Sequence, residues 1–362
     1  MNYKQYKNGW IKLITYSLLF FPECVFSQTD SDAVKLYNNG HYVKAIKACS
    51  ELLKANKKDT TAYIYSGLSK EAMKDYYGAR RDFKKLYKLN PKDAGAHFKC
   101  GELAVLDEDY LRARKEYTKA IEIDPTYAMA YNNRGNVEFQ IGPYGDALKD
   151  FTTAIQLDSN YADPYFNRGH VKLTMKDYKG AVEDFSMVLG LIPTDADAYF
   201  ERGAANEYLA NYEGALNDYD NVIQMDSSRD DVYLFRGNMK LKLNNAVGAA
   251  EDFGMRIKYD SSDYTAYYFL GIALDSLGNY YDAIKFFTYA INIEANLADA
   301  NNTEPYFPDA YFGRGYAYEK NGNKNEGCED LNYAYYRGVN GAQKLIDEFC
   351  TPKRTLQFLK RK

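Results

Sequence analysis

Residues 162–195 read ADPYFNRGHVKLTMKDYKGAVEDFSMVLGLIPTD, and the 34 residues before them, 128–161, read AMAYNNRGNVEFQIGPYGDALKDFTTAIQLDSNY. Apolar residues in residues 162–195 recur three or four positions apart in two separate runs, which is the period of an amphipathic α-helix. Between the runs, Met175-Lys176-Asp177 takes the place held by Gly142 in the preceding segment and marks a tight turn. Each segment is therefore predicted to be a helical hairpin.

The same pattern repeats along most of the chain. Glycine recurs every 34 residues, at Gly67, Gly101, Gly135, Gly169, Gly203, Gly237 and Gly271. An aromatic residue or His97 stands four residues before each glycine, an alanine twelve residues after it, and a Phe or Tyr sixteen residues after it. Pro91, Pro125 and Pro193 end three of the units, where they stop the second helix.

The small residues have a packing role. A glycine or alanine lets a neighbouring helix approach closely, and a bulky Phe or Tyr fills the space that remains. A single hairpin cannot bury both of its faces, so the hairpins are expected to stack and to fold through interfaces with their neighbours.

A 34-residue helix–turn–helix with these residues at these offsets resembles the tetratricopeptide repeat (TPR). The resemblance implies an all-α fold, a right-handed α-solenoid of about nine repeats with a capping helix at the C-terminal end. The units are placed at 28–59, 60–93, 94–127, 128–161, 162–195, 196–229, 230–263, 264–297 and 308–340. Local departures, such as His97 for an aromatic and Arg256 for a small or branched apolar residue, are expected to weaken single interfaces.

The segments outside these units have expectations of their own. Residues 298–307 are expected to form an insertion loop, because the stretch from Asn296 to Phe307 contains Asn301-Asn302-Thr303-Glu304-Pro305, which cannot be helical throughout. Residues 341–349 read as one amphipathic helix that caps the last repeat. The basic residues Lys353, Arg354, Lys360, Arg361 and Lys362 form a tail, with residues 341–362 as one terminal segment.

Residues 1–27 resemble a secretory signal peptide. Lys4, Lys7 and Lys12 precede a short apolar run, and Val25 and Ser27 are the small residues before a cleavage site near Ser27. The expected location is therefore exported, either periplasmic or secreted. The apolar run is too short to span a bilayer, and no membrane span is expected in the mature chain. A lipid anchor at Cys24 is not expected, since Phe21-Pro22-Glu23 lacks the small residue of such sites.

Composition and motifs favour binding over catalysis. The net charge of −4 becomes −6 once residues 1–27 are removed, which argues against nucleic acid as a partner. The three histidines, His41, His97 and His170, lie in different repeats, and no HExxH, CxxC or phosphate-binding glycine loop is present. No enzymatic activity, cofactor or metal site is predicted.

Two further patterns predict structural contacts. Arginines directly before the repeat glycine are matched by aspartates sixteen residues later, which predicts the ion pairs Arg134–Asp150, Arg168–Asp184, Arg202–Asp218, Arg236–Asp252 and Arg314–Asp330, formed within a hairpin or across the next interface. Cys328 and Cys350 lie eleven residues on either side of position 339, where Gly338 to Gly341 should turn the chain, and a disulfide between them is the favoured interpretation. Two thiols that face opposite sides remain the alternative. Cys49 and Cys100 are expected to stay free and buried.

The predicted function is a scaffold that binds proteins or peptides in the concave groove of the solenoid. The resemblance places first-helix residues there: Asn132, Asn133, Asn136, Phe166, Asn167, His170, Phe200, Glu201, Phe235, Asn238, Tyr268 and Phe269. Amides can bind an extended backbone, and aromatic residues can form side-chain pockets; packing of the aromatics between adjacent first helices is the competing interpretation. A holdase-type chaperone for exported unfolded chains is the alternative function. The sequence defines neither the partner nor the oligomeric state.

Overall fold

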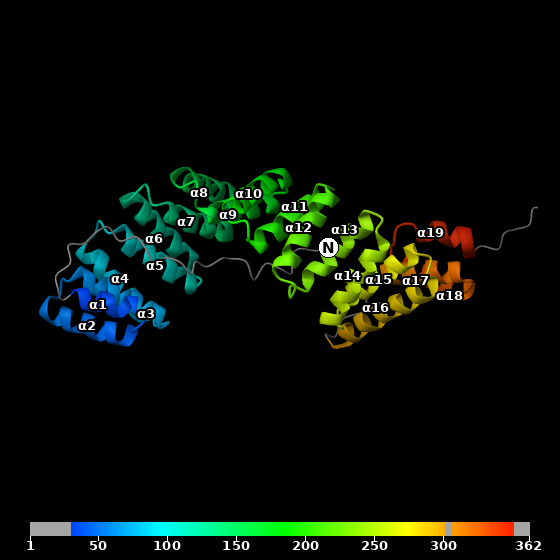
Figure 1. Ribbon diagram of the computed structural model, residues 1–362, viewed down its shortest axis with the longest axis horizontal. Helices are drawn as coiled ribbons and strands as arrows, with labels where there is room; N and C mark the ends of the chain where they lie inside the picture. The colour runs from blue at the N-terminus through cyan, green and yellow to red at the C-terminus, as the bar shows by residue number, and fades with distance from the viewer. Residues whose placement is uncertain (1–29, 301–305, 351–362) are drawn as a thin grey trace, which may run out of the picture. The chain divides into compact units, whose positions relative to one another are not determined.

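The computed structural model describes residues 30–300 and 306–350, and every regular element in these ranges is a helix (Figure 1). The expected signal peptide, Cys24 and the basic tail lie outside the described residues. The chain divides into two compact units, Met1–Ile192 and Pro193–Lys362. No described helix is both long enough and apolar enough to cross a membrane.

The first unit contains five hairpins, and consecutive helices within it pack on one another. In chain order the helices are α1 (Asp30–Asn38), α2 (Tyr42–Ala55), α3 (Thr60–Ala72), α4 (Tyr76–Leu89), α5 (Ala94–Leu106), α6 (Tyr110–Ile123), α7 (Ala128–Ile141), α8 (Tyr144–Leu157), α9 (Ala162–Thr174) and α10 (Tyr178–Leu191). Odd-numbered helices are the first helices of their repeats, and even-numbered helices are the second helices.

The second unit continues the pattern. Its helices are α11 (Ala196–Tyr208), α12 (Tyr212–Met225), α13 (Asp231–Lys242), α14 (Ala246–Tyr259), α15 (Tyr264–Ser276), α16 (Tyr280–Ala300), α17 (Pro308–Asn321) and α18 (Lys324–Tyr336), followed by the short α19 (Ala342–Leu345). Helix α16 is 21 residues long and continues to Ala300. The expected loop over 298–307 is therefore wrong at its start, since Leu297, Ala298 and Ala300 are favourable helix residues and the helix continues to Ala300.

In most of the described hairpins, a capping side chain fixes the turn between the two helices. The carboxylate of Asp177 accepts a hydrogen bond from the Gly180 amide at the start of α10, and Asp75 does the same for Gly78 in α4. Asn211 caps α12 in the same way. The residue before each of these three caps takes a left-handed conformation, with φ 62° at Lys74, 64° at Lys176 and 56° at Ala210. A left-handed conformation is unfavourable for a residue other than glycine. The packing of the two helices therefore imposes this conformation on the turn.

The core of seven of the described hairpins contains the contact between the repeat glycine and the aromatic residue sixteen positions later. A Cβ added at Gly135 would lie 2.7 Å from the Phe151 ring, and one added at Gly237 would lie 2.6 Å from the Phe253 ring. Gly67, Gly101, Gly169, Gly203 and Gly271 face their aromatic partners in the same way. Phe151 and Phe253 are fully buried, and burial of each such ring contributes roughly 1.5–3 kcal/mol. This contact explains why glycine recurs in one phase.

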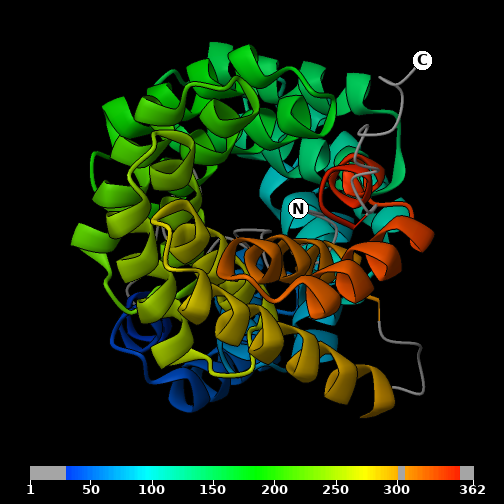
Figure 2. The ribbon, with the colours of Figure 1, turned by 90° about the vertical axis from the view of Figure 1, so that its right-hand side faces the viewer.

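The C-terminal end differs from the single amphipathic helix expected over 341–349. After α19, residues Ile346–Cys350 form a π-helical turn, and both segments pack on α18, as the red and orange ribbons of Figure 2 show. Gly341, with φ 91°, begins this segment in a conformation that glycine adopts without strain. The last repeat is thus covered by a short, irregular segment in place of a regular helix.

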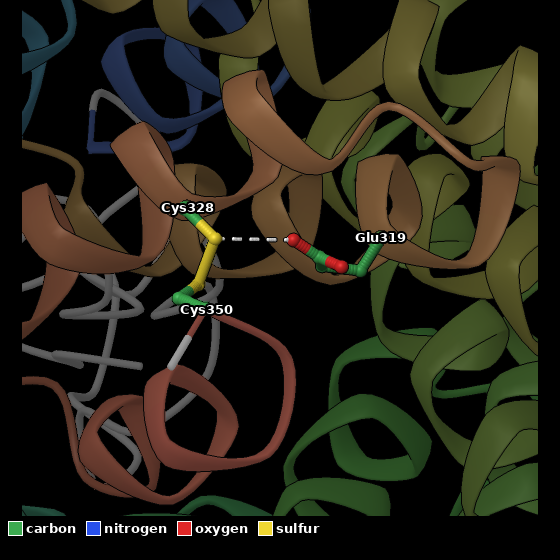
Figure 3. Close-up of side chains that lie close together, drawn as sticks. All are labelled: Glu319, Cys328 and Cys350. Carbon is green, nitrogen blue, oxygen red and sulfur yellow. Dashed lines mark hydrogen bonds between the residues drawn. A yellow bond between two sulfur atoms is a disulfide. The ribbon is translucent and has the colours of Figure 1, made fainter. Parts of the chain in front are cut away.

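A disulfide between Cys328 and Cys350 holds this segment on α18, with the two Cα atoms 5.6 Å apart (Figure 3). Glu319 of α17 lies beside it, with Oε1 3.4 Å from Cys328 Sγ. Three potential metal ligands therefore meet at one place, but sulfurs joined to each other provide no thiolate for a metal ion. Cys49 and Cys100 are free and buried, as expected, and burial raises the pKa of each thiol to about 12.

Candidate partner-binding surface

The arginine before the repeat glycine joins three helices. Arg168 on α9 donates from Nη2 and Nε to both carboxylate oxygens of Asp184 on α10, at 2.7 and 2.9 Å. Its Nη1 donates to Thr152 Oγ1 on α8 of the preceding repeat, at 3.1 Å. The hydrogen bond to Asp184 raises the pKa of the guanidinium, so the charge is retained. The arginine therefore holds its own hairpin together and binds the neighbouring one.

The structure brings all five expected pairs together, each within its own hairpin. The shortest distances are 2.7 Å for Arg134–Asp150, 2.7 Å for Arg168–Asp184, 2.6 Å for Arg202–Asp218, 2.6 Å for Arg236–Asp252 and 2.7 Å for Arg314–Asp330. Each guanidinium also lies 5.1–5.7 Å from the ring centroid of a tyrosine three residues earlier. The carboxylates are buried, which makes these pairs part of the hairpin core.

A second group on the first helix reaches the same aspartate, and the sequence interpretation did not include it. Lys172 lies 2.9 Å from Asp184, Lys240 lies 2.8 Å from Asp252, and Asn206 donates to Asp218 at 3.1 Å. The signal was available, because these residues stand four positions after the arginine, one helical turn along the same face.

Repeats that lack the arginine use other partners for the second helix. Asp82 accepts from Ser66 at 2.6 Å and pairs with Lys70. In the repeat 94–127, His97 Nδ1 lies 2.9 Å from Glu116 Oε2, while its ring stacks on Tyr87 at 4.5 Å. His97 thus provides both the ring contact and the polar partner, so the expectation of a weakened interface at this position is not supported.

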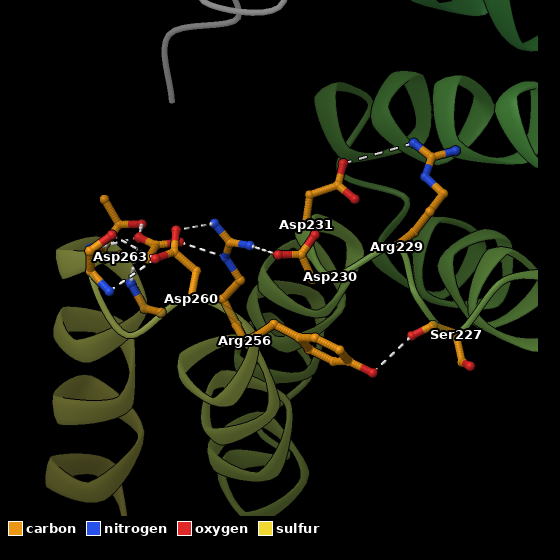
Figure 4. Close-up of polar contacts among 11 residues, drawn as sticks. Ser227, Arg229, Asp230, Asp231, Arg256, Asp260 and Asp263 are labelled. Atoms are coloured by element: carbon orange, nitrogen blue, oxygen red, sulfur yellow. Dashed lines mark hydrogen bonds and ion pairs between the residues drawn. The ribbon is translucent and has the colours of Figure 1, made fainter.

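Arg256 on α14, which departs from the apolar pattern of the repeat, forms ion pairs with three aspartates. Its guanidinium is bound by Asp230 from the preceding turn and by Asp260 and Asp263 from the following one, with 3.2 Å to Asp260 and 2.7 Å to Asp263 (Figure 4). These contacts connect the ends of three helices in the second unit. The arginine replaces an apolar contact with a charged one, so the expected weakening of this interface is likewise unsupported.

The amides predicted for the groove form a buried network in the first unit. Asn132 is 1% exposed and donates from Nδ2 to Asn133 Oδ1 at 3.3 Å and to the Tyr161 hydroxyl at 3.2 Å. Asn167 on α9 donates to Asn132 Oδ1 at 3.0 Å, which links two adjacent first helices. Burial raises the pKa of the Tyr161 hydroxyl, so it stays protonated. Asn132 and Asn133 therefore bind each other and their neighbours, which corrects the expectation that they stand open to a partner.

The aromatic side chains expected in the groove are largely buried too. In the first unit, Phe166 is 3% exposed and its ring contacts His170 at 4.9 Å and Phe185 at 5.6 Å. In the second unit, Phe200 and Phe235 are buried and contact each other at 5.2 Å. These three rings pack between helices, which was the competing interpretation, and Glu201 in the second unit is buried as well.

The remaining predicted residues are half-buried. They are Asn136, Asn167 and His170 in the first unit and Asn238, Tyr268 and Phe269 in the second. Asn238 bonds the Leu234 carbonyl at 3.0 Å, and Phe269 stacks on Phe253 at 5.6 Å. Burial raises the pKa of Tyr268 to about 12, which keeps its hydroxyl protonated. We call these six residues the half-buried first-helix set, because each combines a packed part with an accessible part.

The architecture defines the class of protein before any comparison: an α-solenoid made of 34-residue hairpins. Family models described as "TPR repeat" match residues 108–142 and 135–176, and one described as "Tetratricopeptide repeat" matches residues 264–297. The chain therefore contains tetratricopeptide repeats, and its other hairpins have the same architecture. No curated protein sequence matches it.

Two solved structures show the same fold. The C-terminal part of a TPR repeat-containing protein from Cytophaga hutchinsonii is similar with a TM-score of 0.56 and 18% identity, and covers 66% of this chain and 97% of that one. Pseudomonas aeruginosa PilF is similar with a TM-score of 0.50 and 23% identity, over 57% of this chain and 95% of that one. MamA has 26% identity and a TM-score of 0.43, over 48% of this chain and 94% of MamA.

Proposed function

We propose that the chain is an exported scaffold that binds segments of other proteins along the first helices of its repeats, and that it has no catalytic role. The observation that carries the proposal is the half-buried first-helix set. This set places amide and aromatic groups on helices. Buried residues such as Asn132 and Phe166 hold these groups in position. Side chains held in this way lose little entropy when they bind.

The chemistry fits an extended peptide. Asn136 and Asn167 can offer donors and acceptors to a peptide backbone, and His170, Tyr268 and Phe269 can contact apolar side chains. Asn132 accepts a hydrogen bond from Asn167, and the Phe166 ring contacts His170, so both groups are supported from the interior. Export is supported by the pattern of residues 1–27, in which basic residues precede a short apolar run and small residues.

The test is the affinity of variants for a partner identified by crosslinking and mass spectrometry in the native cell. Replacement of Asn136 and His170 together by Ala should weaken binding by roughly 10- to 100-fold, if two contacts of about 1 kcal/mol each are lost. The matched control is the double variant Lys149→Ala/Lys179→Ala, on exposed second-helix positions of the same unit. Equal affinities for both double variants would contradict the proposed surface.

A further inference from the structure

The outer surface of α4 carries a group of cationic side chains that the proposed function does not use. Arg81, Lys84, Lys85 and Lys88 lie within two turns of this helix, and no described residue forms an ion pair with any of them. Asp82, the acidic residue of α4, is buried and pairs with Lys70. The helix therefore presents unneutralised positive charge on one side.

These side chains, with Tyr77 and Arg80, line a hollow of about 220 Å³. Arg80 donates to the Leu103 carbonyl at 2.8 Å and pairs with Asp107, so its position is fixed from the next repeat. The hollow combines an aromatic ring at one end with lysine and arginine side chains along its length, a lining suited to a phosphate group attached to an apolar chain.

Large apolar side chains project from the same place in three consecutive repeats. Val43, Tyr77 and Leu111 occupy the second position of α2, α4 and α6, and are 67%, 78% and 65% exposed. Exposed cations accompany the outer two, namely Lys44 on α2 and Lys115 on α6. Single exposed apolar residues are common, but a row of three at one repeat position beside a basic face is a pattern.

We propose that this surface, defined by Val43, Tyr77, Leu111, Arg81 and Lys85 with the other α4 cations, binds the anionic surface of a lipid bilayer. Lysine and arginine are attracted to acidic headgroups, and projecting apolar side chains can enter the boundary between headgroups and acyl chains. Protein interfaces are depleted in lysine, whereas this face is rich in it, which favours lipid over a protein partner.

The experiment is sedimentation of the full chain with vesicles of phosphatidylcholine alone or mixed with phosphatidylglycerol. The chain should bind the mixed vesicles more tightly, and high salt should weaken that extra binding because it screens exposed charges. Each cation at the surface contributes about fivefold to binding, so Arg81→Glu/Lys85→Glu should reduce it by at least about 25-fold. Tyr77→Ser should reduce it too, since it removes an inserted side chain.

The control is Lys149→Glu/Lys179→Glu, which makes the same change in net charge on exposed positions of α8 and α10. This variant should bind the mixed vesicles nearly as the unchanged chain does. Circular dichroism of each variant confirms that it is folded. The proposal is overturned if the chain prefers neither vesicle, or if both double variants lose binding equally.

Discussion

Replacing Gly237 by Ala tests the packing that makes glycine recur every 34 residues. The added Cβ would lie 2.6 Å from Cε1 of Phe253, a ring with no exposed surface, so the ring or the helix must move. Overpacking of this kind costs about 1–3 kcal/mol, while Ala in place of Gly inside a helix contributes about 1 kcal/mol. The free energy of unfolding should therefore fall by about 1 kcal/mol.

Gly254 provides the matched control in the same repeat. It lies inside α14, is exposed, and has no atom within 4 Å of an added Cβ. Gly254→Ala should raise the free energy of unfolding by about 0.5–1 kcal/mol through helix propensity alone. The two variants should thus differ by about 2 kcal/mol in urea unfolding followed by circular dichroism. A gain in stability for Gly237→Ala equal to that of Gly254→Ala would refute the packing argument.

Three further outcomes are expected. Burial raises the pKa of Asp275 to about 6, although the charge of Lys320 lowers it, and one carboxylate oxygen has no hydrogen-bond partner. The stability that the protonated carboxyl group provides is complete below about pH 4 and is lost as the pH rises toward 6. Asp275→Asn should remove that loss, about 1–2 kcal/mol after allowance for partial exposure, and an unchanged pH profile of unfolding would contradict this. Ala210→Gly should stabilise the protein by about 0.5–1 kcal/mol in urea unfolding, because φ is 56° at Ala210; a loss of stability would show that the turn is not strained. Thiol counting on the denatured, unreduced full chain should find three of its five cysteines reactive, since the bridge between Cys328 and Cys350 removes two, and five reactive thiols would exclude the bridge.

The periodic contacts could be predicted from sequence because each depends on residues at a fixed spacing. The glycine and its aromatic partner stand sixteen residues apart in every unit from Gly67 to Gly271, and the arginine and aspartate follow the same spacing. A hairpin brings residues at this separation together whatever surrounds it. The match of Arg with Asp, and the loss of both at Cys100 and Glu116, made the ion pairs visible without coordinates.

The binding surface was harder to predict, because helical periodicity does not distinguish a side chain between two first helices from one open to a partner. Phe166 and Phe200 stand next to the packed tyrosine in sequence, yet both are buried. Arg256 shows the same limit, since its three aspartate partners lie in two turns that only the fold brings together. The end of α16 at Ala300 depended on local helix propensity, which the unit boundary at 297 did not take into account.

Site-specific photocrosslinking in the native cell tests the central claim, that the first-helix side of the repeats binds other proteins. A photoreactive residue at the half-buried Asn136 is compared with one at the exposed Lys149 of the same repeat. A discrete protein adduct is expected at position 136, with little adduct at position 149. Replacement of His170 by Ala in the chain that carries the probe at position 136 should weaken that adduct. Adducts of equal yield at both positions, or at position 149 alone, would contradict it.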